Sequence, residues 1–220
     1  MKKFFLSGVL FFVFFGIHLA YADDYEAKIK AFWDFVSENE NDIVILNSRD
    51  SPVLYELFDK IQSIDKNIYV ILDNRLENNK KNIIISCGGN RNYFTLCDRI
   101  VGAAPAYEHL NPVSLFPPLE RIEPFTYGDI QLKTEDVRVC FDIADSNIEL
   151  LFILNDEHTA ILRTDNSGAL YNAYMQMLFV MVQQILGERM AGEKIKSGGI
   201  IPVKVVLPSM PITEIREHIK

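Results

Sequence analysis

The amino-acid sequence reads VRVCFDIADSNIELLFIL over residues 137–154, and this segment predicts two β-strands joined by a short turn. The first strand alternates apolar residues with more polar ones, which is typical of a half-buried strand. The second, 148–154, is apolar almost throughout, as expected at the centre of a sheet. A long helix is predicted over 169–186, with Ser167 as its N-cap. Apolar residues cover most of its circumference, so other elements must surround it.

The N-terminal half is predicted to begin with two amphipathic helices. In the first helix, the apolar positions recur at helical spacing: Ile29, Phe32, Trp33 and Val36. The polar segment 37–42 follows, and its acidic residues fit a solvated helix end; a cation or a basic partner is the alternative. Ser51 and Pro52 then supply a cap and a first-turn proline. The buried stripe expected in the second helix consists of Leu54, Leu57, Phe58 and Ile61.

Two β-branched runs, 68–72 and 83–85, predict a hairpin around the polar segment 73–82. A third helix follows the second run, with Phe94, Cys97, Ile100 and Val101 facing inward. The segment 105–124 contains five prolines, which lack the amide donor that a central strand needs. We therefore expect a loop there with a short edge strand around 113–116. A strand over 200–207 and a short helix after Pro211 complete the chain.

Strands and helices are mixed without regular βαβ alternation, so the predicted class is α+β. We expect two lobes of mixed sheet with packed helices, and one long buried helix in the second lobe. The expected divisions are a signal peptide over 1–22, an N-terminal lobe over 23–125 and a C-terminal lobe over 126–220. The proline-rich segment marks the boundary between the lobes.

The first 22 residues have the features of a secretory signal peptide. Two lysines precede an apolar run, and Ala20-Tyr21-Ala22 presents small residues at the two positions that a signal peptidase reads. The run is too short and too glycine-interrupted for a spanning helix, so a mature protein beginning at Asp23 is expected in the periplasm or outside the cell. Removal of the leader lysines takes the net charge from −8 to −10. That charge argues against a nucleic-acid partner and against stable association with anionic membranes.

Several segments resemble a group of bacterial proteins whose function is unassigned. These are the opening FWDFVSENE at 32–40, a strand–Gly–helix step ending in Ala103-Ala104-Pro105, and Leu186-Gly187-Glu188 followed by Lys194-Ile195. In the last segment this chain has Lys196 where the group has glycine. The resemblance implies a shared α+β fold and no established chemistry.

The segment Cys87-Gly88-Gly89-Asn90-Arg91 lies between a predicted strand and a predicted helix. Backbone amides at a helix N-terminus can hold an anion, and Arg91 could assist. The segment has neither the dinucleotide-binding nor the phosphate-loop pattern, and two glycines in a tight turn are also explained by positive φ angles. Gly88, Gly89, Asn90 and Arg91 are the candidate binding residues.

The three cysteines leave two possibilities open. Cys87 and Cys97 could form a disulfide bond if the glycine turn folds the helix back, or both could be buried thiols. Cys140 with His158 is a possible nucleophile pair. We find no HExxH or CxxC motif and no Gly-x-Ser-x-Gly elbow, and we predict no catalytic residue, metal or cofactor.

On the long helix, Met175, Met177 and Met181 are expected to fill the core, with Tyr171 and Tyr174 at its margin.

The sequence therefore favours a secreted or periplasmic binding module, one that does not catalyse a reaction. Its ligand, a protein or a small molecule, is not specified. The alternative is a periplasmic hydrolase whose carboxylates come together only in the fold, because thirty acidic residues allow many such pairs. A pocket lined by paired acids would favour the hydrolase, and an apolar surface patch would favour the binding module.

Overall fold

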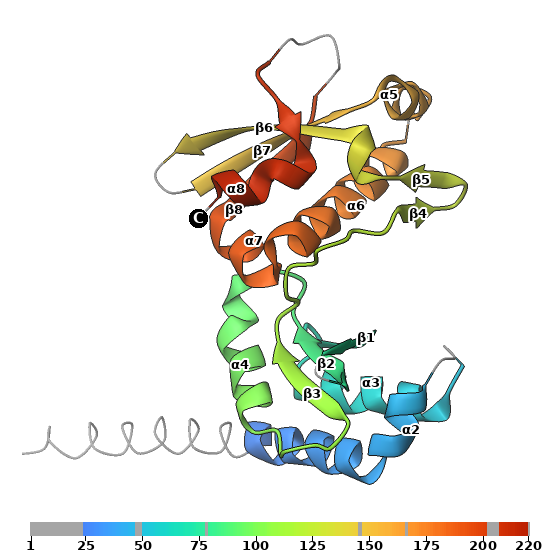
Figure 1. Ribbon diagram of the computed structural model, residues 1–220, viewed down its shortest axis with the longest axis vertical. Coiled ribbons are helices and arrows are strands. Elements are labelled where there is room, and N and C mark those ends of the chain that lie inside the picture. Colours follow the sequence, from blue (N-terminus) through green and yellow to red (C-terminus); the bar gives the residue numbers. More distant parts are fainter. Residues whose placement is uncertain are drawn as a thin grey trace, which may run out of the picture. The chain divides into compact units, whose positions relative to one another are not determined.

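The computed structural model describes residues 24–46, 50–77, 79–144, 147–165, 167–201 and 207–219 (Figure 1). The predicted leader, the turn at 145–146 and most of the strand predicted at 200–207 lie outside these ranges. The described residues form helices and three mixed sheets, which confirms the α+β class. The described residues divide into two compact units. The first consists of those up to Cys87 together with 95–114, and the second consists of 88–94 together with those from 115 onward.

The first unit contains a three-stranded sheet and four helices within its described part. The helices are 24–38, α2 (Glu40–Ile45), α3 (Pro52–Ile64) and α4 (Phe94–Gly102), whose residues from Thr95 onward belong to this unit. The strands are β1 (Tyr69–Glu77), β2 (Lys80–Ser86) and β3 (Leu110–Ser114), in the order β1-β2-β3. β1 and β2 form the predicted antiparallel hairpin, and β3 is parallel to β2 at the edge of the sheet.

The core of this unit follows the predicted helical spacing with three exceptions. Ile29, Phe32, Trp33 and Val36 are all buried. In α3, however, Leu57 and Ile61 are buried while Leu54 is only partly buried and Phe58 is 38% exposed, so the predicted stripe of that helix is too wide. In α4, Cys97 and Ile100 are buried, and Val101 is only partly so. Phe94, the first residue of α4, is buried too but belongs to the second unit. The buried stripes of α3 and α4 are narrower than predicted, because each helix buries only the positions that face the rest of the protein.

A buried lysine in the first unit was not expected from the sequence. Lys81 lies on β2 with 3% of its surface exposed. Its Nζ donates to the carbonyl oxygens of Ile43 and Leu46 at 3.1 Å and to that of Val44 at 3.3 Å. Carbonyls at the C-terminal end of a helix lack intrahelical partners and attract cations. The Lys81 ammonium group therefore caps α2 from the neighbouring strand.

The Lys81 side chain predicts a specific pH dependence of stability. Burial lowers its pKa from 10.5, so between the lowered pKa and 10.5 the unfolded chain binds more protons than the folded chain. Stability from this group should therefore rise with pH in that window. We expect the free energy of unfolding of the wild type to increase relative to Lys81→Met as the pH rises toward 10.5, as measured by urea unfolding. The exposed Lys66→Met is the control, and an equal pH dependence in both variants would contradict the prediction.

The second unit is built on a four-stranded sheet in the order β8-β7-β6-β9. Its strands are β6 (Val137–Ala144), β7 (Asn147–Leu154), β8 (Ile195–Ile200) and β9 (Met210–Pro211). β6 and β7 are antiparallel, β8 runs parallel to β7, and β9 runs antiparallel to β6. The predicted central position of residues 148–154 is therefore confirmed. A separate hairpin consists of β4 (Phe125–Tyr127) and β5 (Ile130–Leu132).

Helix α6 (Ala169–Leu186) has the bounds predicted from the sequence and packs against this sheet (Figure 1). The remaining helices of the unit are the 3-10 turns η1 (Arg91–Tyr93), η2 (Thr134–Asp136) and η3 (Ile212–Glu214), with α5 (Asp156–Arg163), α7 (Glu188–Lys194) and α8 (Ile215–His218). The helix predicted after Pro211 is thus present. Among the described residues, none of the helices has both the length and the apolar character needed to cross a bilayer.

The ends and faces of α6 differ from the expectation in two ways. The N-cap is Gly168, although the Ser167 hydroxyl still accepts a hydrogen bond from the Ala169 amide at 3.2 Å. Met177 and Met181 are core residues as predicted, with Met175 packed beside them. Tyr174 is wholly buried rather than marginal. A helix that is apolar around most of its circumference gives no sequence signal for which face lies deepest.

Candidate functional site

The glycine turn follows β2 and leads into η1. Gly88 and Gly89 have φ angles of +63° and +80°, a left-handed conformation that glycine adopts at little steric cost. The side-chain oxygen of Asn90 then accepts a hydrogen bond from the Asn92 amide at 3.2 Å and caps η1. The two glycines therefore have the positive φ angles that the sequence suggested.

A buried carboxylate occupies the position where an anion could have met the turn. Glu188, at the start of α7, is only 1% exposed. Its Oε1 accepts from the Gly89 amide and its Oε2 from the Phe116 amide, both at 2.9 Å, and its own amide donates to the Phe116 carbonyl at 2.8 Å. Charge-assisted bonds of this kind offset the cost of burying the carboxylate. The Gly89 amide is therefore committed to Glu188, which corrects the idea that this amide would hold an external anion.

Helix α7 lies directly against the turn because residue 192 is glycine. A Cβ at Gly192 would clash with the Gly89 carbonyl oxygen and would come within 2.6 Å of Phe94 Cζ. On the same helix, the Arg189 guanidinium lies 5.3 Å from the centre of the Phe94 ring, a cation–π distance. Behind the turn, Gln183 approaches Gly89 so closely that a Cβ there would meet its amide nitrogen. The turn is thus fixed by contacts on two sides.

The close approach at Gly192 predicts a destabilising substitution. Gly192→Ala is expected to lower the free energy of unfolding by about 1–3 kcal/mol, the usual cost of overpacking. The matched control is Gly102→Ala at the end of α4, where an added Cβ meets nothing within 4 Å. That change should be neutral or stabilising by about 0.4–1 kcal/mol. Urea unfolding of both variants tests the pair, and equal effects would refute the close packing of α7 on the turn.

A pocket of about 510 Å³ opens beside the turn. Its lining combines two segments that are distant in the sequence: Gly89, Asn90, Arg91 and Asn92 from the turn, and Gly192, Glu193, Ile195 and Lys196 from α7 and β8. Three of the four candidate binding residues are among these, whereas Gly88 is exposed and is not part of the lining. The residues of the second segment were not candidates, because a separation of about a hundred positions leaves no spacing signal.

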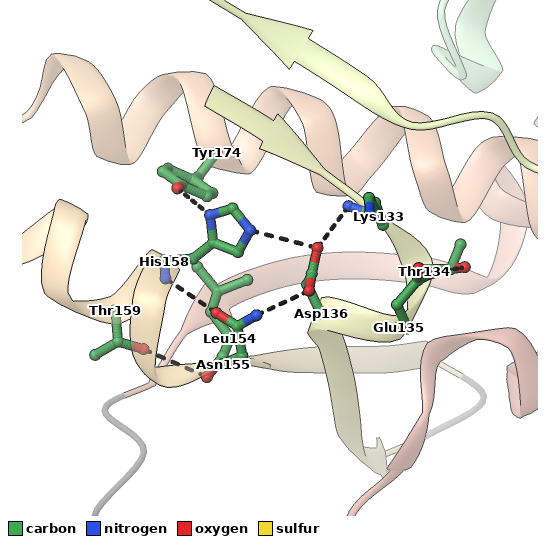
Figure 2. A network of polar contacts seen from close by, with 9 residues as sticks. All are labelled: Lys133, Thr134, Glu135, Asp136, Leu154, Asn155, His158, Thr159 and Tyr174. Atoms are coloured by element: carbon green, nitrogen blue, oxygen red, sulfur yellow. Dashed lines mark hydrogen bonds and ion pairs between the residues drawn. The ribbon is translucent and has the colours of Figure 1, made fainter. Parts of the chain in front are cut away.

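A second polar cluster surrounds His158, at the start of α5 (Figure 2). His158 is 4% exposed, and its Nδ1 lies 2.6 Å from the Tyr174 hydroxyl while its Nε2 lies 3.4 Å from Asp136 Oδ2. Asp136 also accepts from the Asn155 side-chain amide at 2.8 Å and from the Lys133 backbone amide at 2.9 Å. These contacts join η2, the end of β7 and α6.

The chemistry of the His158 cluster is that of a closed network. Burial, with smaller contributions from nearby carboxylates, raises the pKa of Tyr174 to about 12, so its hydroxyl stays protonated at neutral pH. That hydroxyl can donate to Nδ1 of a neutral imidazole, whose Nε2–H then points at Asp136. Both ring nitrogens of His158 are thus engaged within the network. The arrangement stabilises the unit and leaves neither nitrogen directed at solvent.

The outer edge of this cluster lines a pocket of about 460 Å³. Three carboxylates border it: Asp129, Asp136 and Glu157. Lys133, His158 and three further residues complete the lining. Asp129 and Glu157 are exposed, while the Asp136 carboxylate is hydrogen-bonded on both oxygens. The acidic character of this pocket therefore comes chiefly from two solvated side chains.

The structure resolves the alternatives for the cysteines. All three lie in the described part of the chain, and no disulfide bond joins any two of them; Cys87 and Cys97 are buried. Cys140 and His158 are not a pair, because the Cys140 thiol contacts the Leu151 carbonyl at 3.7 Å and His158 contacts Tyr174 and Asp136. Among the described residues, no group of three or more His, Cys, Asp or Glu is arranged to hold a metal ion.

Comparisons of the chain with models of protein families, with curated proteins and with solved structures found no match.

Proposed function

We propose that this protein is a non-catalytic binding module that acts in the periplasm or outside the cell, and that its ligand binds beside the turn formed by Gly88, Gly89, Asn90 and Arg91. The main support is the pocket of about 510 Å³ beside the turn, which three of these residues line. Pockets that bind small ligands typically measure about 300–1,000 Å³. The turn is held in place by Glu188 and by the Gly192 contact, so the binding residues are arranged before a ligand arrives.

A non-catalytic role is supported by how the described reactive side chains are used. His158 is engaged on both nitrogens, and Tyr174 is buried with a pKa that keeps it protonated. A general base needs a ring nitrogen or carboxylate within reach of a substrate. The other histidines in the part of the chain that the structure describes, His109 and His218, are exposed, and neither lines one of the two pockets described above.

The rival function, a periplasmic hydrolase, has one observation in its favour. The pocket beside His158 is bordered by three carboxylates, and two carboxylates across a pocket can act as acid and base. Asp136 is committed to hydrogen bonds, which leaves Asp129 and Glu157 as the pair to test. A hydrolytic activity that is lost in both Asp129→Asn and Glu157→Gln would establish this function in place of the binding module.

The experiment that tests the binding module is a comparison of variants in an affinity capture. The wild type, Arg91→Glu and the control Arg163→Glu are immobilised and exposed to a periplasmic extract, and bound proteins and small molecules are identified by mass spectrometry. Arg163 is an exposed arginine in the last turn of α5. A ligand captured by the wild type and by Arg163→Glu but not by Arg91→Glu supports the proposal. Equal capture by all three, or capture of nothing, would refute it.

A further inference from the structure

We infer that the pocket beside the glycine turn binds a small molecule through an oxyanion, a phosphate or a carboxylate group. This inference rests on the proposed function and specifies its ligand class. Two cationic side chains line the pocket, Arg91 from the turn and Lys196 from β8, against a single acid, Glu193. The chain as a whole has a net charge of −8, so a local excess of positive charge is unusual for it.

Both cations are available to a ligand. Arg91 and Lys196 are exposed, and among the described residues neither side chain forms a hydrogen bond or an ion pair. Two like charges that share a pocket repel each other, and an anion bound between them would relieve that repulsion. Arginine offers a planar pair of donors that matches phosphate or carboxylate, and lysine adds a second charge.

The position of Glu188 explains why side chains rather than backbone amides would hold the anion. The Gly89 amide donates to Glu188, the Asn92 amide to Asn90 Oδ1, and the Tyr93 amide to the Asn90 carbonyl. These three backbone amides therefore already have acceptors within the protein. An external anion would therefore contact the outer surface of the turn, where Arg91 and the exposed side chain of Asn92 are located.

The ligand is a small molecule because the walls of the pocket are close and fixed. Gly192 packs on the Gly89 carbonyl, so α7 and the turn form two walls that cannot separate without breaking this contact. The pocket of about 510 Å³ lies in the range of small-ligand sites, and it is lined mainly by polar atoms of the two segments. A compact anionic molecule fits these limits.

The test is an NMR titration of the ¹⁵N-labelled protein at constant ionic strength, with sodium phosphate in one arm and sodium acetate in the other. The amide signals of Gly89, Asn92 and Lys196 are followed. We expect saturable shifts in at least one arm, and the arm that saturates identifies a phosphate or a carboxylate ligand. Arg91→Gln and Lys196→Gln should each weaken binding about tenfold, the value of one charge-assisted hydrogen bond.

Two controls keep the inference open to refutation. Arg163→Gln, which removes an exposed cation outside the pocket, should leave the affinity within about twofold, and Lys196→Arg should retain binding. Thermal melting of each variant shows that it is folded. Shifts that rise linearly without saturation in both arms, or an equal loss in Arg163→Gln, would overturn the inference.

The outcomes separate this inference from the proposed function. A ligand captured from the extract in an Arg91-dependent manner, with no saturation by phosphate or acetate, would support the proposed binding function and contradict the inference that the ligand carries an oxyanion. Saturable binding of phosphate that depends on Arg91 and Lys196, with no ligand captured from the extract, would keep the oxyanion site and refute the periplasmic binding role.

Discussion

Replacing Trp33 with alanine is expected to lower the free energy of unfolding by about 3–5 kcal/mol, the usual cost of truncating a large buried aromatic side chain. Trp33 is 3% exposed, and its indole lies 4.7 Å from the Phe32 ring and 6.0 Å from the Tyr107 ring, measured between centroids. Its Nε1 donates to the Ile100 carbonyl oxygen at 2.7 Å. The substitution therefore removes packing and a buried hydrogen bond together.

Two further variants separate these contributions to the Trp33 effect. Trp33→Phe keeps a ring but loses the indole N–H, so it should cost less than the alanine variant, about 1–3 kcal/mol. Tyr55→Ala, at a site that is 54% exposed in the same unit, should cost less than about 1 kcal/mol. Urea unfolding followed by circular dichroism measures all three. An unchanged unfolding midpoint for Trp33→Ala would mean that the residue lies on the surface.

Replacing Glu188 with alanine is expected to cost about 2–4 kcal/mol, because two amide donors lose their acceptor at about 1–2 kcal/mol each. The donors are the amides of Gly89 and Phe116, and the carboxylate that receives them is 1% exposed. Glu188→Gln should have a smaller effect, since one oxygen remains. Amide hydrogen exchange should accelerate at both Gly89 and Phe116 in Glu188→Ala and at only one of them in Glu188→Gln, which identifies the bonds that are lost.

The matched control for Glu188 is another glutamate on the same helix. Glu193 is exposed on α7, and Glu193→Ala should change the free energy of unfolding by no more than about 0.5 kcal/mol. Similar losses from the two substitutions would show that Glu188 acts only through its helical propensity. Slow exchange at Gly89 in Glu188→Ala would show that the turn is held by other contacts.

The sequence predicted the elements whose signal is local. The bounds of α6, the central position of β7 and the burial of Phe32 and Trp33 follow from periodicity, which neighbouring residues specify among themselves. The glycine turn was also identified, because two adjacent glycines indicate positive φ angles. Errors arose where periodicity gave no direction, as at Tyr174 on a helix that is apolar on most sides.

The candidate site was only half predictable. Gly89, Asn90 and Arg91 were identified from one segment, but Glu188, Gly192 and Lys196 come from another. The burial of Lys81 was likewise missed, because the carbonyls that accept hydrogen bonds from its ammonium group lie at the end of α2, far from β2 in the sequence. In each case the partner lies tens of positions away, and a single sequence contains no signal of that pairing.

The amino-acid sequence alone determined the class of fold, the positions of most helices and strands, and the turn at which a ligand is expected. These properties depend on interactions between residues a few positions apart, so they can be inferred from composition and spacing. The tertiary structure decided that Glu188 takes the Gly89 amide, that Arg91 and Lys196 share one pocket, and that His158 is enclosed by Tyr174 and Asp136. Those pairings arise only when burial brings distant segments together and each polar group must find a partner.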